Sequence, residues 1–151
     1  MPTKSEVISK ALEMLDEKLH YLTIELLALN QSKGEDTKSS AGDKFETGRE
    51  MISQEISKIE SQLSQNRQQK NALIQIQDKK VGASLICSGS LVHLAERWFL
   101  ISVSLGEINI KQEKVFLLSE GSPLGKSLLG KKEQDQVFFQ GKAHTIQKVL
   151  N

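Results

Sequence analysis

Residues 8–29 read ISKALEMLDEKLHYLTIELLAL, and their apolar side chains decide the fold of the first half of the chain. These side chains recur at alternating spacings of four and three residues, the pattern of the a and d positions in a coiled-coil helix. The positions are Ile8, Leu12, Leu15, Leu19, Leu22, Leu26 and Leu29. The pattern predicts a long helix with one apolar seam. Pro2 and Thr3, just ahead of it, are suited to a helix start.

A second series with the same alternation follows, but it is interrupted near its end by Asn66 and Lys70. It consists of Phe45, Arg49, Ile52, Ile56, Ile59, Leu63, Asn66, Lys70 and Leu73. The intervening residues 32–44 are rich in Gly, Ser, Thr and Asp, which favour turns, so we expect both helices to end there. Two seams joined by a short connection predict an antiparallel hairpin over residues 1–80, with an acidic tip loop at about 33–46. The alternatives are two helices packed on a globular core, or a coiled coil between chains.

Residues 81–151 have a different composition, with five of the seven aromatic residues and seven of the ten glycines. We expect a short helix over 122–130, because Ser122 suits an N-cap, Pro123 the first helical position and Gly130 the end. Short β-rich runs are predicted at 81–87, 91–94, 98–104, 107–110, 114–118, 136–140 and 144–150. The sequence therefore predicts an α+β protein, with the helical hairpin followed by a small antiparallel sheet and one short helix.

The overall composition excludes several classes of protein. The net charge of +1 provides no global field for nucleic acid or membrane, and a single cysteine excludes an internal disulfide. No apolar run approaches the length of a membrane span or a signal sequence, so we expect a cytoplasmic protein without a membrane partner.

The spacing of the glycines excludes a phosphate-binding loop. Gly121 and Gly125 are separated by three residues rather than four, and Pro123 removes a backbone donor, so a capped helix start is the better interpretation. The three histidines, His20, His93 and His144, lack the paired spacing of a metal site.

The connection between the predicted helices carries the remaining chemical signal. It holds the carboxylates Glu35, Asp36, Asp43 and Glu46. Carboxylates are hard oxygen ligands for Mg²⁺, yet exposed ones hold the ion weakly. The arrangement suits an arm that delivers carboxylates to a partner already holding metal and phosphate, and the alternative is an ordinary solvated loop.

A hairpin with an acidic tip followed by a small α+β domain resembles the bacterial Gre transcript-cleavage factors (GreA and GreB). The most specific match is SPLGKSLLGKK at 122–132, which is similar to the family's Ser-Pro, short helix and Leu-hydrophobic-Gly-Lys stretch. Residues 98–101, 135–138 and 145–149 match strands of the same domain. The resemblance covers nearly the whole chain.

The resemblance implies an FKBP-like fold for residues 81–151, and it implies RNA polymerase as the partner. The C-terminal domain would dock at the rim of the polymerase secondary channel, with Ser122, Pro123 and Leu124 as partner-binding residues. The hairpin would enter the channel and meet the nascent RNA 3′ end only indirectly. The protein would be a monomeric accessory factor rather than an enzyme, without a tightly bound cofactor of its own. It would share the polymerase Mg²⁺, which would activate water for hydrolysis of backtracked RNA.

The tip departs from the family pattern, because the family's first catalytic Glu falls on Ala41 when Phe45 is aligned with the family tyrosine. Catalytic residues therefore cannot be transferred one by one. We rank the assisting carboxylates as Asp43, Asp36, Glu35 and Glu46, with Asp43 and Asp36 as the metal-directed pair. Basic residues around the tip are predicted to contact RNA or polymerase, or else to balance charge: Lys33, Lys38, Lys44 and Arg49.

Three alternative functions remain. The altered tip motif favours a channel-binding regulator or inhibitor without cleavage activity. An FKBP-type prolyl isomerase or chaperone would need an aromatic pocket. Because adjacent strand residues point to opposite faces, we expect only part of the set Trp98, Phe99, Phe116, Phe138 and Phe139 to line one pocket. The third alternative is a purely structural, dimerising coiled coil.

Overall fold

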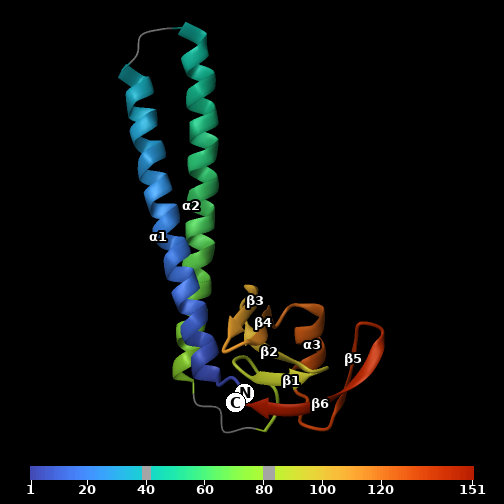
Figure 1. The fold of residues 1–151 in the computed structure, drawn as a ribbon. Coiled ribbons are helices and arrows are strands. Elements are labelled where there is room, and N and C mark those ends of the chain that lie inside the picture. Colours follow the sequence, from blue (N-terminus) through green and yellow to red (C-terminus); the bar gives the residue numbers. More distant parts are fainter. Residues whose placement is uncertain (39–41, 80–83) are drawn as a thin grey trace. The chain divides into compact units, whose positions relative to one another are not determined.

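The computed structural model describes residues 1–38, 42–79 and 84–151, without the side chains of residues 35–38 and 42–47. It contains two long helices packed against each other, followed by a six-stranded sheet and a short helix (Figure 1). The predicted α+β class is therefore confirmed. The chain forms two compact units, residues 14–69 and residues 1–13 with 70–151. The unit that contains the sheet thus includes helical residues on the N-terminal side of residue 80.

The two long helices are α1 (Lys4–Lys38) and α2 (Gly42–Asp78), which lie side by side in Figure 1. In the unit of residues 14–69, Leu22, Ile59 and Leu63 form a buried cluster. Leu19, Leu26 and Leu29 pack against it. These are the predicted seam positions, so the hairpin buries its own apolar stripe and confirms the intramolecular alternative.

One predicted defect of this seam is itself buried. Asn66 is only 4% exposed, and its Nδ2 makes no hydrogen bond to any part of the chain that the structure describes. A buried amide without a partner is costly, and a lone polar residue in a coiled-coil seam is a known device for setting register.

The helices extend further toward the connection than the turn-forming composition indicates. We expected a loop over about 33–46, whereas α1 continues to Lys38 and α2 begins at Gly42. Consecutive hydrogen-bonded turns can extend a helix through residues of modest propensity because propagation costs less than nucleation. Residues 39–41 lie outside the described residues.

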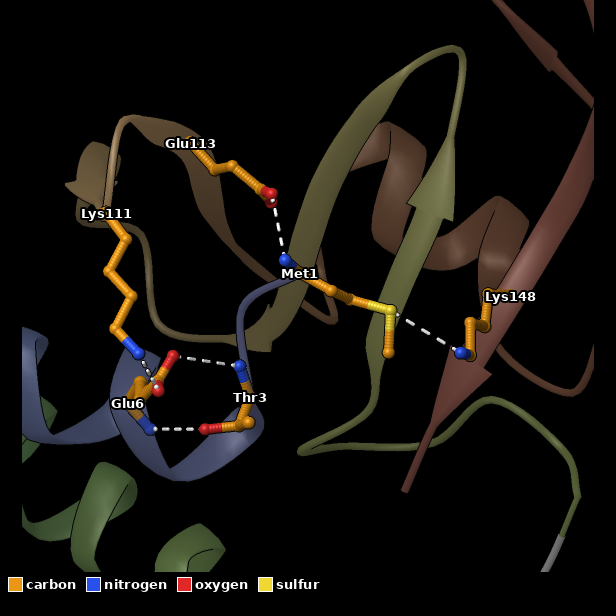
Figure 2. A network of polar contacts seen from close by, with 6 residues as sticks. All are labelled: Met1, Thr3, Glu6, Lys111, Glu113 and Lys148. Carbon is orange, nitrogen blue, oxygen red and sulfur yellow. Dashed lines mark hydrogen bonds and ion pairs between the residues drawn. The ribbon is translucent and has the colours of Figure 1, made fainter.

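The start of α1 is closed by a capping box (Figure 2). The Glu6 amide donates to Thr3 Oγ1 at 3.1 Å, and the Thr3 amide donates to Glu6 Oε2 at 3.2 Å. This reciprocal pair satisfies two amides that a helix terminus otherwise leaves without partners. The predicted start near Pro2 and Thr3 is confirmed.

The six strands lie in the order β3-β4-β2-β1-β6-β5. Their bounds are β1 (Leu91–Leu94), β2 (Arg97–Ser102), β3 (Gly106–Ile110), β4 (Glu113–Ser119), β5 (Gln136–Phe139) and β6 (Lys142–Leu150). Each corresponds to a predicted run. The run predicted at 81–87 is wrong in its described part, because residues 84–87 form no strand. Instead, the Ile86 amide donates to the Lys131 carbonyl at 2.7 Å, and the Gly130 amide donates to the Ile86 carbonyl at 2.9 Å.

The sheet is antiparallel except for one pair of strands. β2 and β4 run parallel, with Phe99 opposite Phe116. The reason is topological: β3 lies at the edge, and the chain turns back so that β4 is inserted between β3 and β2. The expectation of a purely antiparallel sheet needs this correction.

Three two-residue turns connect the hairpins, and both residues of each turn have positive φ. They are Ala95-Glu96 (51° and 60°), Lys111-Gln112 (49° and 70°) and Gln140-Gly141 (53° and 79°). Positive φ at both positions is the requirement of a type I′ turn, whose twist matches that of the flanking strands. Only Gly141 avoids the steric cost of this conformation.

One face of the sheet forms a continuous core with the short helix α3 (Pro123–Leu128). Its buried members come from five strands, from α3 and from the segment before β1: Ile86, Val92, Leu94, Phe99, Ile101, Leu118, Leu128, Val137 and Ile146. The partly buried Leu124 and Phe139 pack against this cluster.

Candidate functional site: an aromatic groove beside α3

The first turn of α3 is built around Ser122. Its hydroxyl accepts a hydrogen bond from the Gly125 amide at 3.0 Å and donates one to the Ser119 carbonyl at 2.7 Å. Pro123 occupies the start of the helix, and Gly130, with φ of 80°, follows its end. The predicted capped helix is confirmed, and the Ser122 hydroxyl is fully engaged in it.

Gly125 is required by close packing rather than by phosphate binding. A β-carbon at this position would lie 2.2 Å from the Ser119 carbonyl oxygen and 2.8 Å from Ser122 Oγ. The glycine therefore lets α3 approach the end of β4 closely. This contact accounts for the glycine of the Gly-Lys-Ser sequence.

A groove of about 480 Å³ lies beside this turn. Its walls come from β2, β4, α3 and the hairpin of β5 and β6. The lining residues are Arg97, Phe99, Phe116, Leu118, Ser122, Pro123, Leu124, Ser127, Phe138, Phe139 and Gln140. The three residues proposed above for partner binding, Ser122, Pro123 and Leu124, therefore lie together in one wall of a hollow.

Four phenylalanines meet in this groove. The Phe99 ring is buried between two others, with its centroid 6.3 Å from that of Phe116 and 5.7 Å from that of Phe139. Phe116 is 43% exposed and Phe138 is 72% exposed. Trp98 points to the opposite face of the sheet, where it stacks on His93 at 4.6 Å. Alternation thus separates Trp98 from Phe99 as expected, but both members of the Phe138-Phe139 pair line the groove.

Among the described residues that line the groove, Arg97 is the single charged one. It is exposed at the start of β2, and the described part of the chain supplies it with no ion pair. Arg97 is not predicted as a site residue, since nothing in the local sequence indicates that β2 begins beside α3.

A second hollow of about 780 Å³ adjoins the groove and shares Arg97, Phe99 and Phe116 with it. Its other walls carry charges of both signs, from Glu96, Glu107, Glu113, Lys114 and Lys148. Three of these charges are already partnered: Lys114 Nζ lies 3.2 Å from Glu107 Oε1, and Glu113 Oε1 lies 3.0 Å from the N-terminal nitrogen of Met1. Arg97 lines both hollows.

The tip residues are placed by the backbone alone. Glu35, Asp36 and Lys38 belong to the last turns of α1, while Asp43, Lys44 and Glu46 belong to the first turns of α2. Their side chains lie outside the described residues. Lys33 is exposed, and Arg49 is partly buried with an Nε atom that makes no hydrogen bond to the described chain.

No other arrangement in the described ranges resembles a metal or membrane site. Those ranges contain no group of three or more His, Cys, Asp or Glu side chains placed to hold a metal ion. They also contain no helix with the length and apolarity needed to cross a bilayer. His20 is exposed, in keeping with a surface role. The His144 ring packs against Phe139, with the two ring centroids 6.1 Å apart.

Comparison with known proteins adds no assignment: no protein-family model and no curated protein matches the chain.

Proposed function

We propose that the protein is a Gre-like transcription elongation factor that binds RNA polymerase and stimulates cleavage of backtracked RNA. The observation that carries the proposal is the hairpin itself. Its helices have 35 and 37 residues, and residues 14–38 of α1, which lie outside the unit that contains the sheet, extend about 37 Å. Carboxylates occupy both helix ends beside the connection. An arm of this length suits the delivery of charge into a deep, narrow channel.

The tip carboxylates have the donor chemistry that Mg²⁺ prefers, so these residues fit a metal shared with a partner. Asp43 and Asp36 would contribute ligand oxygens, with Glu35 and Glu46 adjacent to them. The polymerase Mg²⁺, when bound, supplies activation of the attacking water and stabilisation of the leaving oxygen. The role of this chain is to position the carboxylates, which makes it an accessory factor.

The groove beside α3 is the proposed docking surface for the polymerase. It contains Ser122, Pro123 and Leu124, and it exposes the rings of Phe116 and Phe138. Exposed aromatic side chains gathered in one hollow are a common feature of protein interaction sites.

The test adds the purified protein to a backtracked elongation complex of the RNA polymerase of the same organism, with Mg²⁺, and follows the RNA 3′ end on a gel. We expect faster release of 3′ fragments, and loss of that effect in the Asp36→Ala/Asp43→Ala double variant. The Glu55→Ala/Glu60→Ala variant is the matched control, because it removes two exposed carboxylates from the body of α2. Binding without cleavage would make the protein a channel-binding regulator, and absence of binding would reject the proposal.

A second candidate is a prolyl isomerase or chaperone, favoured by the convergence of four phenylalanines on one groove. A proline-isomerisation assay with a Phe116→Ala control tests it. Turnover above background that is lost in the variant supports the isomerase, and equal background rates reject it.

A further inference from the structure

The apolar surface of the groove comes from strands that are distant in sequence. Phe116 lies on β4 and Phe138 on β5, and both rings remain exposed although they line the same hollow. Burying large rings from water stabilises a complex in proportion to the apolar area removed. The groove is therefore suited to an occupant that presents a bulky apolar side chain.

Most of the polar groups in the groove are already used within the chain. The Ser122 hydroxyl caps α3, and the Ser127 hydroxyl donates to the Pro123 carbonyl at 3.0 Å. These groups add little recognition of a polar small molecule. Apolar contact and the Arg97 guanidinium are the main features that remain available to an occupant.

Arg97 defines the charge of that occupant. The other ten lining residues carry no charge, and a guanidinium binds a carboxylate through two parallel hydrogen bonds. An acidic group next to the apolar side chain complements the groove, whereas a basic group would face Arg97 without compensation.

The volume of the groove defines the size of the occupant. At about 480 Å³, the groove has the volume of a ligand-binding site rather than that of one side chain. A short length of polypeptide can occupy this space, with its acidic residue beside Arg97.

We propose that the groove binds a peptide segment of a partner protein in which a bulky apolar residue lies beside an aspartate or glutamate. The apolar side chain packs among Phe99, Phe116 and Phe138, and the carboxylate pairs with Arg97. This inference rests on the proposed function in one respect, because it assigns the segment to the surface of the polymerase.

The experiment selects peptides from a random displayed library with the full-length protein. We expect enrichment of sequences with a bulky apolar residue within two positions of Asp or Glu. The selected peptide, made synthetically, should bind Arg97→Glu at least about tenfold more weakly, as expected when one partner of a charge pair is replaced. Selection with Arg97→Glu should enrich Lys or Arg in place of the acid. Lys142→Ala is the control, because Lys142 is exposed on β6 and is absent from the groove lining.

Thermal melting of each variant separates loss of binding from loss of folding. Enriched peptides without an acid, or peptide binding unchanged by Phe138→Ala, would overturn the inference. A polymerase-binding assay with the wild type and the variants separates failure of this inference from failure of the proposed function. If the wild-type protein does not bind polymerase, the proposed function fails. If polymerase binds Arg97→Glu and Phe138→Ala as well as it binds the wild type, the inference fails while the proposed function stands.

Discussion

Lys111 Nζ lies 2.8 Å from Glu6 Oε1, which ties the turn between β3 and β4 to the first turn of α1 (Figure 2). The same Glu6 carboxylate accepts the Thr3 amide through its other oxygen. One side chain thus completes the capping box and an ion pair between segments more than a hundred residues apart. The hydrogen bond from Lys111 and the one from Thr3 lower the pKa of Glu6, and the hydrogen bond to Glu6 raises the pKa of Lys111.

The pair predicts a specific pH dependence of stability. Because the pKa of Glu6 is lower in the folded state, its contribution is present above the unfolded value of about 4.3 and is lost as pH falls through the folded pKa. Because the pKa of Lys111 is raised, its contribution is present below about 10.4 and is lost as pH rises through the folded pKa. We expect Glu6→Gln to lower Tm at pH 7 and to reduce the acid-induced fall in Tm.

Thermal melts of the wild type and Glu6→Gln between pH 2 and 7 measure this effect. Glu17→Gln, an exposed carboxylate farther along α1, is the control and should follow the wild-type curve. A constant offset between the wild-type and Glu6→Gln curves over the whole range would contradict the assignment.

Gly125→Ala is expected to destabilise the protein by about 2 kcal/mol or more, because the new methyl group would overlap the Ser119 carbonyl. Gly121→Ala is the matched control, since the nearest described atom to its β-carbon would be the Ser119 hydroxyl oxygen at 4.0 Å. Urea unfolding followed by circular dichroism gives both free energies. Equal stability of the two variants would show that α3 does not pack against β4 in this way.

Asn66→Leu is expected to stabilise the hairpin by about 1–2 kcal/mol, since it replaces a buried amide that lacks a partner for Nδ2 with an apolar side chain. Gln65→Leu, at the exposed position next to Asn66, is the control and should leave the free energy of unfolding nearly unchanged. Thermal unfolding measures the difference, and sedimentation of Asn66→Leu tests whether the asparagine also prevents association. A lower Tm for Asn66→Leu would show that the amide is stabilising.

Ala95→Asn/Glu96→Gly is expected to raise the free energy of unfolding by about 1 kcal/mol, because Asn-Gly adopts positive φ more readily than the native pair. The double change removes strain from the turn between β1 and β2. Ala95→Pro/Glu96→Pro is the opposite control, since proline cannot adopt positive φ and should destabilise the hairpin. Chemical unfolding compares the three proteins. An Asn-Gly variant with the wild-type free energy of unfolding would mean that the turn is not strained.

The hairpin and the cap of α3 could be predicted because their signals are local. Leu22 and Leu26 share a helix face through the helical period, and Ser122, Pro123 and Gly130 act on a helix that they adjoin. The hairpin turns were harder to predict, because Ala95-Glu96 and Lys111-Gln112 contain no glycine or asparagine. Pairing of the flanking strands holds these residues at positive φ against their own preference.

The local spacing of apolar and capping residues was therefore enough to establish the helical pair, most strands and the α+β class. Tertiary structure alone inserts β4 beside β2 and brings Arg97, Phe116 and Phe138 to one groove. These residues are separated by tens of positions, and no local periodicity relates them. Their meeting depends on long-range strand pairing and on the close approach of α3 at Gly125, which arise only when the whole sheet buries its apolar face.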